Sequence, residues 1–145
     1  MIKLLCSKSK IGDIPMPSEY YKPCIELDKC CELIEKYFNT QQYDLCFKGY
    51  LKLAEKEYPL AECQVGYFYL EGLGVDKDLS KAFYWTQLAA NHGDRDGQYN
   101  LAWFYENGIG ISVDIVKAKF WYKKSAAQNH NLAINKCNEL GIKII

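Results

Sequence analysis

The sequence predicts an all-α protein in which helix pairs stack on one another. Three observations predict this class: a long pattern that recurs after 36 residues, glycine pairs that break each copy, and apolar residues at helical spacing between the breaks. A repeat period of about 20 to 50 residues is typical of stacked supersecondary units rather than of a single catalytic pocket. The fold can therefore be argued closely from the sequence, whereas the identity of a partner cannot.

The two copies of the pattern match at the positions that turn, cap and pack a helix pair. The first copy reads Tyr69-x-x-Gly72-x-Gly74-Val75-x-x-Asp78-x-x-Lys81-Ala82-x-x-Trp85. The second copy reads Tyr105-x-x-Gly108-x-Gly110-Ile111-x-x-Asp114-x-x-Lys117-Ala118-x-x-Trp121. Since each shared position has a physical role, chance is a poor explanation of the match.

The chain before the first copy is expected to hold a leader and a degenerate unit. Residues 1–24 contain Pro15, Pro17 and Pro23 and are expected to be irregular. Residues 25–58 are expected to form a degenerate helix pair, with one helix ending near Phe38 and a second over residues 41–57. The link at residues 39–42 has no glycine pair, so it is expected to be a tighter αα-hairpin.

The first full repeat is expected over residues 59–94. Pro59 suits the first position of a helix, because its missing N–H would be unpaired there in any residue. Gly72 and Gly74 tolerate positive φ and are expected to end this helix. Asp78 is expected to cap the next helix through its carboxylate. Gly66 lies mid-helix, where the lack of a side chain lets a neighbouring helix approach closely.

The second full repeat is expected over residues 95–130 on the same plan. Asp94 and Asp114 are the expected caps of its two helices, and Gly108 and Gly110 form the turn between them. Residues 131–145 are expected to form a C-terminal capping helix, which ends near Gly141, and an apolar tail.

At these residues the sequence resembles the Sel-one-like repeat, a branch of the tetratricopeptide superfamily. The longest match is Ala61-x-x-Gln64-x-Gly66-x-x-Tyr69 through Ala89-Ala90-x-x-Gly93, and the resemblance covers about residues 59–140. It implies a short right-handed α-solenoid of antiparallel helix pairs. It also implies an adaptor or scaffold that binds other proteins, with no enzymatic activity and no cofactor in the repeat itself.

Composition excludes several other classes of protein. The formal net charge is zero, and 17 lysines stand against a single arginine, so the sequence lacks the strongly basic face of a nucleic-acid-binding protein. No apolar run approaches the roughly 20 residues of a membrane span or forms a signal-peptide core. The seven cysteines have no closed disulfide or zinc spacing. A cytoplasmic location is the expectation.

The candidate binding residues are those at which the two copies differ. In helix-pair solenoids the first helix of each pair usually lines the concave face, and the motif positions are occupied by packing. Contacts to a protein or peptide are therefore expected from variable positions of these two helices: Cys63, Gln64, Tyr67, Leu70, Tyr99, Asn100, Trp103 and Glu106. Tyr67 and Trp103 are the expected anchors because aromatic side chains dominate binding energy, although half-buried packing is the alternative explanation.

Two alternative functions remain open at this point. Ile142, Ile144 and Ile145 could meet a second copy and give a homo-oligomer, which would make the chain a structural module. Cys24, Cys30 and Cys31 could supply thiolates to a metal, although neighbouring cysteines point to different helix faces. No catalytic residue, cofactor site or membrane partner is expected.

Overall fold

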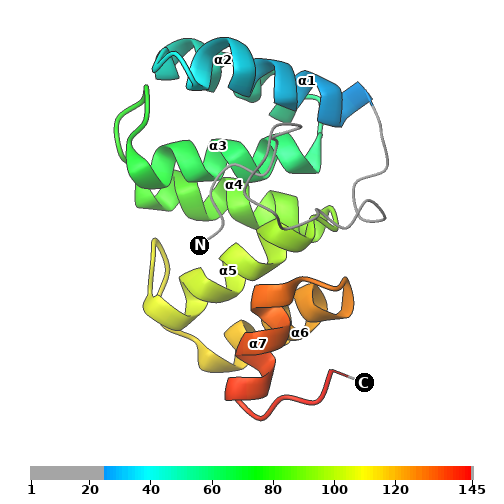
Figure 1. The fold of residues 1–145 in the computed structure, drawn as a ribbon. Coiled ribbons are helices and arrows are strands. Elements are labelled where there is room, and N and C mark those ends of the chain that lie inside the picture. The colour runs from blue at the N-terminus through cyan, green and yellow to red at the C-terminus, as the bar shows by residue number, and fades with distance from the viewer. Residues whose placement is uncertain (1–24, 145) are drawn as a thin grey trace.

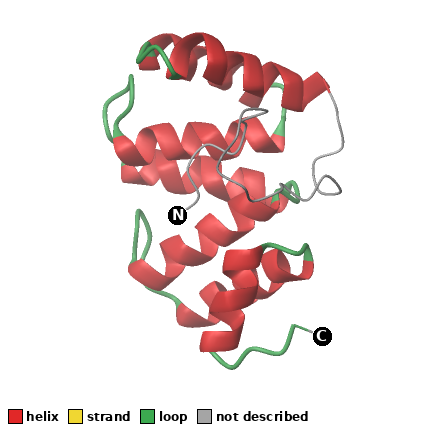
Figure 2. Cartoon of the chain, in the orientation of Figure 1, coloured by secondary structure: helices red, strands yellow, loops and turns green. Residues whose placement is uncertain are grey.

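The structure is a computed structural model that describes residues 25–144 of the chain (Figure 1). The expected leader, residues 1–24, and the terminal Ile145 lie outside the described residues. Helices and loops make up the described part, which contains no strand (Figure 2). The elements in chain order are α1 (Ile25–Leu33), the π-helical turn η1 (Ile34–Phe38), α2 (Tyr43–Ala54), α3 (Pro59–Glu71), α4 (Leu79–Asn91), α5 (Arg95–Asn107), α6 (Ile115–Ala127) and α7 (Asn131–Glu139).

The helices form a short right-handed α-solenoid, as the sequence predicts. Each helix from α2 to α7 packs mainly on its neighbours in the chain, and α3 also touches α5 in the next repeat. Figure 1 shows this progression from α1 and α2 at one end to α6 and α7 at the other. The two full repeats therefore correspond to the pairs α3–α4 and α5–α6, with α7 closing the described stack.

The predicted turns and caps are confirmed. Gly72 and Gly108 end α3 and α5 in the left-handed conformation, with φ of 68° and 69°. The carboxylates of Asp78 and Asp114 each accept a hydrogen bond of 3.0 Å from the backbone N–H three residues on, and so cap α4 and α6. Asp94 caps α5 in the same way, with a bond of 2.7 Å from the Gly97 N–H.

The second glycine of each loop makes a contact that the sequence did not indicate. Gly74 lies so close to the backbone of Tyr43 and Asp44, at the start of α2, that a Cβ there would overlap it. Gly110 has the same relation to the backbone of Leu79, at the start of α4. Each double-glycine loop therefore packs on the second helix of the preceding unit, where no other residue would fit.

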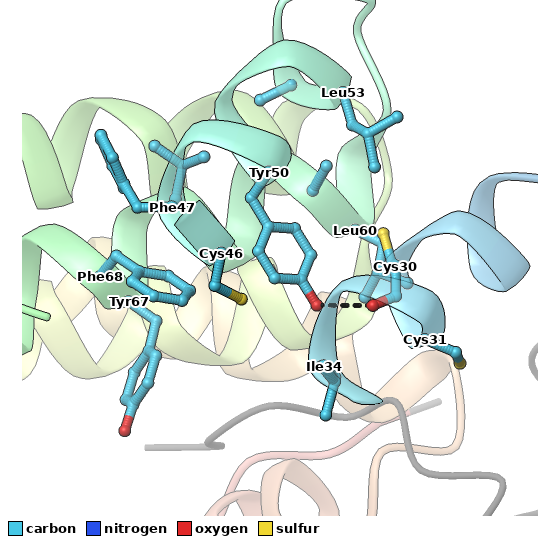
Figure 3. Close-up of a cluster of buried hydrophobic side chains, with 13 residues drawn as sticks. Cys30, Cys31, Ile34, Cys46, Phe47, Tyr50, Leu53, Leu60, Tyr67 and Phe68 are labelled. Carbon is cyan, nitrogen blue, oxygen red and sulfur yellow. Dashed lines mark hydrogen bonds between the residues drawn. The ribbon is translucent and has the colours of Figure 1, made fainter. Parts of the chain in front are cut away.

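Aromatic side chains dominate the core that joins α1, α2 and α3 (Figure 3). Phe68 lies at its centre and contacts the rings of Phe47 and Tyr50 at centroid distances of 6.0 and 5.8 Å. The hydroxyl of the fully buried Tyr50 donates a hydrogen bond of 3.0 Å to the Cys30 carbonyl. This bond ties α2 to α1 and satisfies the buried Tyr50 hydroxyl.

The degenerate first pair departs from the expected α-helix. The backbone N–H of Asn39 bonds to the Ile34 carbonyl at 3.0 Å, and that of Gln42 to the Tyr37 carbonyl at 2.8 Å, which is the spacing of a π-helix. The link of residues 39–42 is short, as expected, and α2 begins at Tyr43 rather than at residue 41. The wider π turn holds Phe38 against Tyr43, with ring centroids 5.1 Å apart.

Candidate protein-binding surface on α3 and α5

The eight candidate residues lie on the two helices that were expected to carry them. Cys63, Gln64, Tyr67 and Leu70 come from α3, and Tyr99, Asn100, Trp103 and Glu106 come from α5. Because α3 touches α5, the two sets belong to neighbouring repeats of one solenoid. Their exposure to solvent differs sharply between the helices.

Helix α3 is covered on almost every side. Every residue from Leu60 to Phe68 is buried, as is Leu70, so the four candidates on this helix have little exposed surface. A helix that is buried on nearly all sides is typical of the centre of a stack. Tyr67 is 7% exposed, and Figure 3 shows its hydroxyl directed away from the other aromatic rings of the cluster. The edge of this ring is among the few parts of α3 that solvent reaches.

Cys63 is a packing residue with a protonated thiol. Burial, together with the nearby carboxylates of Asp94 and Asp96, holds the pKa of the Cys63 thiol well above its ordinary value of 9.0. The Asn100 side-chain amide donates a long bond of 3.6 Å to its sulfur. Because the thiolate is the reactive and metal-binding form, this environment disfavours both nucleophilic and metal chemistry. Among residues 25–144 no cluster of three or more potential metal ligands occurs.

Tyr99, Trp103 and Glu106 on α5 are only partly buried, while Asn100 beside them is buried. The Tyr99 ring stacks on His130 with centroids 4.8 Å apart and planes 9° from parallel, and partial burial raises the pKa of the Tyr99 hydroxyl. The Trp103 ring leans on Phe104 at 5.7 Å. Of the eight candidates, these three half-buried side chains are the ones that solvent reaches most readily.

Glu106 is already held by two neighbours. The Tyr122 hydroxyl donates a bond of 2.6 Å to Glu106 Oε2, and Lys136 Nζ lies 2.9 Å from Oε1. Partial burial alone would raise the pKa of Glu106, but these two donors outweigh it and the pKa is lowered. Glu106 therefore links α5 to α6 and α7, and its oxygens are shared with this internal network.

Two polar pairs between helices, each with a buried carboxylate, were not foreseen from the sequence. Glu62 on α3 is 1% exposed and lies 2.8 Å from His92 at the end of α4. The His130 ring caps α7 by accepting from the Ala133 N–H at 3.2 Å, and its Nε2 lies 3.0 Å from Asp96 without the alignment of a hydrogen bond. The sequence indicated only that a histidine lies near each of two helix boundaries. It did not indicate which residue each histidine would contact.

The comparison with known families decides what this arrangement is. The sequence model of the Sel1 repeat matches residues 59–94 and 95–130, the two stretches that form α3–α4 and α5–α6. The chain is a Sel1 repeat protein. No curated protein matches the sequence at a significant level.

Solved structures of other Sel1 repeat proteins share the fold. A Sel1 repeat protein from Oxalobacter formigenes is 33% identical, with a TM-score of 0.71, over 81% of this chain and 49% of that one. A protective antigen from uropathogenic Escherichia coli is also 33% identical, with a TM-score of 0.70, over 80% of this chain and 24% of that one. The chain thus spans half or less of the length of these two relatives. Cysteine-rich protein B from Helicobacter pylori, at 23% identity and a TM-score of 0.64 over 77% of this chain and 96% of that one, supports the fold alone.

Membership of the Sel1 family indicates a general type of function. Sel1 repeat proteins generally mediate protein–protein interaction, and the repeat is typically a non-catalytic scaffold. Within residues 25–144, every helix is too short or too polar to cross a bilayer.

Proposed function

We propose that this Sel1 repeat protein is an adaptor that binds a protein or peptide across α3 and α5, with Trp103 as its main anchor. The observation that carries the proposal is that Trp103 on α5 packs on a small core cluster and yet remains only half-buried. Neither the double-glycine turn nor a helix cap uses this side chain. Large aromatic rings at such positions supply much of the binding energy of protein interfaces.

Unused hydrogen-bonding atoms on the same two helices support the proposal. Among the described residues, no hydrogen bond reaches the Trp103 indole N–H or the hydroxyls of Tyr67 and Tyr99, and Gln64 Oε1 is buried with no donor. A buried amide oxygen without a donor is unfavourable, so a backbone N–H from an extended peptide would be a favourable partner once the Gln64 side chain turned outward. These side chains together offer apolar contact area and polar groups that can form hydrogen bonds, a combination that is common at protein interfaces.

The test compares two single variants for capture of partners from a lysate of the source cells. Trp103→Ala should lose the proteins captured by the wild-type chain, while Phe120→Ala should keep them. Phe120 is a matched control because it is an aromatic residue, 53% exposed, on α6 rather than on α3 or α5. Far-ultraviolet circular dichroism should be unchanged in both. Equal capture by the two variants would reject α5 as the binding helix, and unfolding of Trp103→Ala would show that its ring is core.

Self-association is the second candidate, and an exposed apolar strip favours it. The strip runs from the loop before α6 into that helix and comprises Ile111, Val113, Ile115, Val116 and Phe120. Val116 is 80% exposed, which is unusual for a valine. By contrast, Ile142 and Ile144 of the tail pack against the core of α5, α6 and α7. Light scattering at two concentrations distinguishes the candidates, because a dimer should dissociate on Val116→Lys substitution whereas a monomeric adaptor should be unaffected.

We further propose that the protein works without catalysis in a reducing compartment such as the cytoplasm. Cys31, Cys46, Cys63 and Cys137 are free and buried, which supports a thiol-preserving environment. Trapping of free thiols in freshly lysed cells tests this, since oxidised cysteines at these positions would argue for an oxidising compartment.

A further inference from the structure

The degenerate first helix pair contains a cavity of about 370 Å³. It lies between α1 with η1 on one side and α2 on the other, and therefore away from the α3–α5 surface. This volume falls within the range of small ligand sites, which is about 300 to 1,000 Å³. The residues that line the cavity are Lys29, Glu32, Leu33, Lys36, Tyr37, Gly49, Lys52, Leu53 and Lys56.

The charged side chains that line this cavity are mostly positive. Four lysines line it against the single carboxylate of Glu32. Within residues 25–144, none of the four lysines forms an ion pair, although Lys36 Nζ lies 5.1 Å from the centroid of the Tyr37 ring. Four like charges around one concavity repel each other and attract an anion. The local sequence does not account for this, because residues 26–78 carry eleven acids and six lysines.

The floor of the cavity is apolar and depends on a glycine. Gly49 on α2 faces the Leu33 side chain so closely that a Cβ there would overlap it. A side chain at position 49 would therefore push into the cavity or move Leu33. On the opposite wall, Lys36 and Tyr37 belong to the π-helical turn, a rare conformation that often occurs at functional sites. The cavity thus combines a basic rim with an apolar floor.

We propose that this cavity docks an acidic peptide segment of a partner protein, at a second surface distinct from α3 and α5. Glutamate or aspartate carboxylates would pair with the rim lysines, and the aliphatic parts of the segment would contact Leu33 and Leu53. A nucleic acid is the less suitable polyanion, because the lining holds no arginine to bind phosphates in a bidentate manner. Residues 1–24 are a poor occupant by charge, since they carry four lysines against two acids.

The test measures fluorescence anisotropy of a fluorescein-labelled hexaglutamate peptide with the full chain at low salt. A labelled hexaglutamine peptide should not bind. Lys52→Gln with Lys56→Gln should weaken hexaglutamate binding about five- to tenfold, in keeping with the loss of two exposed ion pairs. The matched control is Lys119→Gln with Lys123→Gln, which removes two exposed lysines at the same spacing from α6 and should leave binding unchanged. Glu32→Gln should strengthen binding, because it removes the one repelling carboxylate.

Several outcomes would overturn the proposal. Equal losses in the two double variants would show attraction to overall charge and not to the cavity. Complete competition by tripolyphosphate at the peptide's own concentration would indicate a small-anion site, and tighter binding of a thymidine oligonucleotide would indicate a nucleic-acid site. Because hexaglutamate binding does not involve Trp103, the proposal can fail while the α5 proposal stands, and the reverse also holds.

Discussion

The buried Glu62 and the exposed His92 form a pair whose counterpart one repeat later consists of two amides. His92 Nδ1 lies 2.8 Å from Glu62 Oε2, and 36 residues on Gln128 Nε2 donates to Gln98 Oε1 at 2.7 Å. The same contact between the first helix of a repeat and the end of its second helix is therefore made by a carboxyl group and an imidazole in one copy and by two amides in the other. The contact is retained, while the chemistry that makes it has changed.

The unfolding free energy should depend on pH through Glu62. Burial raises the pKa of this carboxyl above its ordinary value of 4.5, and the His92 contact offsets this only in part. The folded chain thus holds the Glu62 proton more tightly than the unfolded chain, so this contribution to stability is full below the unfolded pKa and is lost as pH rises through the folded pKa. Urea unfolding should show that wild type loses stability relative to Glu62→Gln as the pH rises above the ordinary carboxyl pKa of 4.5. Glu71→Gln, on the exposed end of the same helix, should give no such trend.

Glu106 should show the opposite dependence on pH. Its donors, Tyr122 and Lys136, outweigh partial burial and lower the pKa of the carboxyl. Its contribution is therefore present above the unfolded pKa and is lost as pH falls through the folded pKa. Glu106→Gln should cost about 1 kcal/mol near neutral pH, and the cost should shrink towards about pH 3. Glu139→Gln is the control because Glu139 lies 3.9 Å from the same lysine but is largely exposed; a similar cost there would contradict the role of the Tyr122 bond.

The contact of Gly110 with the preceding repeat should make its replacement costly. Gly110→Ala must overcome both the left-handed backbone, with φ of 67°, and overlap with the Leu79 backbone. Gly141 has nearly the same φ, 65°, but a Cβ there meets no atom within 4 Å. Gly141→Ala should therefore lower the unfolding free energy by about 1 kcal/mol and Gly110→Ala by about 2 to 4 kcal/mol. Thermal and urea unfolding measure both, and equal losses would mean that the loop contact contributes nothing.

Native cysteines in the core should resist alkylation. Burial raises the pKa of the Cys46 thiol to about 12 and holds that of Cys63 well above 9.0. Since iodoacetamide reacts with the thiolate, both should stay unlabelled in the folded protein at about pH 8. Peptide mapping by mass spectrometry reads each site separately, and labelling in urea provides the positive control. Rapid native labelling of Cys63 would mean that α3 is far more open than described.

The turns and caps were predictable because their causes are local. Position 72 needs a positive φ, which glycine adopts easily. Position 78 needs a side chain that accepts a hydrogen bond from the backbone N–H three residues later, which aspartate provides. Neither requirement depends on the rest of the fold. The burial of α3 was not predictable in the same way, since it depends on helices on both sides of it. The pattern identified the candidate residues on α3, but only the stack determines how little of Tyr67 remains exposed.

The polar pairs and the cavity could not be predicted from the sequence for a different reason. Glu62 and His92 are 30 residues apart and do not match their counterparts in type, so comparing the two copies hides the contact that they share. The cavity of the first helix pair was equally hidden, because its lysines come from two helices in a segment where acids predominate. Each feature depends on contact between helices, which a single stretch of sequence does not encode.

The position of the glycine loops affects how the molecule unfolds. Gly74 and Gly110 each touch a helix of the unit before their own, so neither loop has its full set of neighbours when that earlier unit is missing. Solenoid stability is a sum of intrinsic terms and interface terms between adjacent repeats. Because the glycine loops contribute to the interfaces between units, denaturation should be cooperative across the stack. A fragment that starts at residue 95 should lack the Leu79 backbone against which its own glycine loop packs.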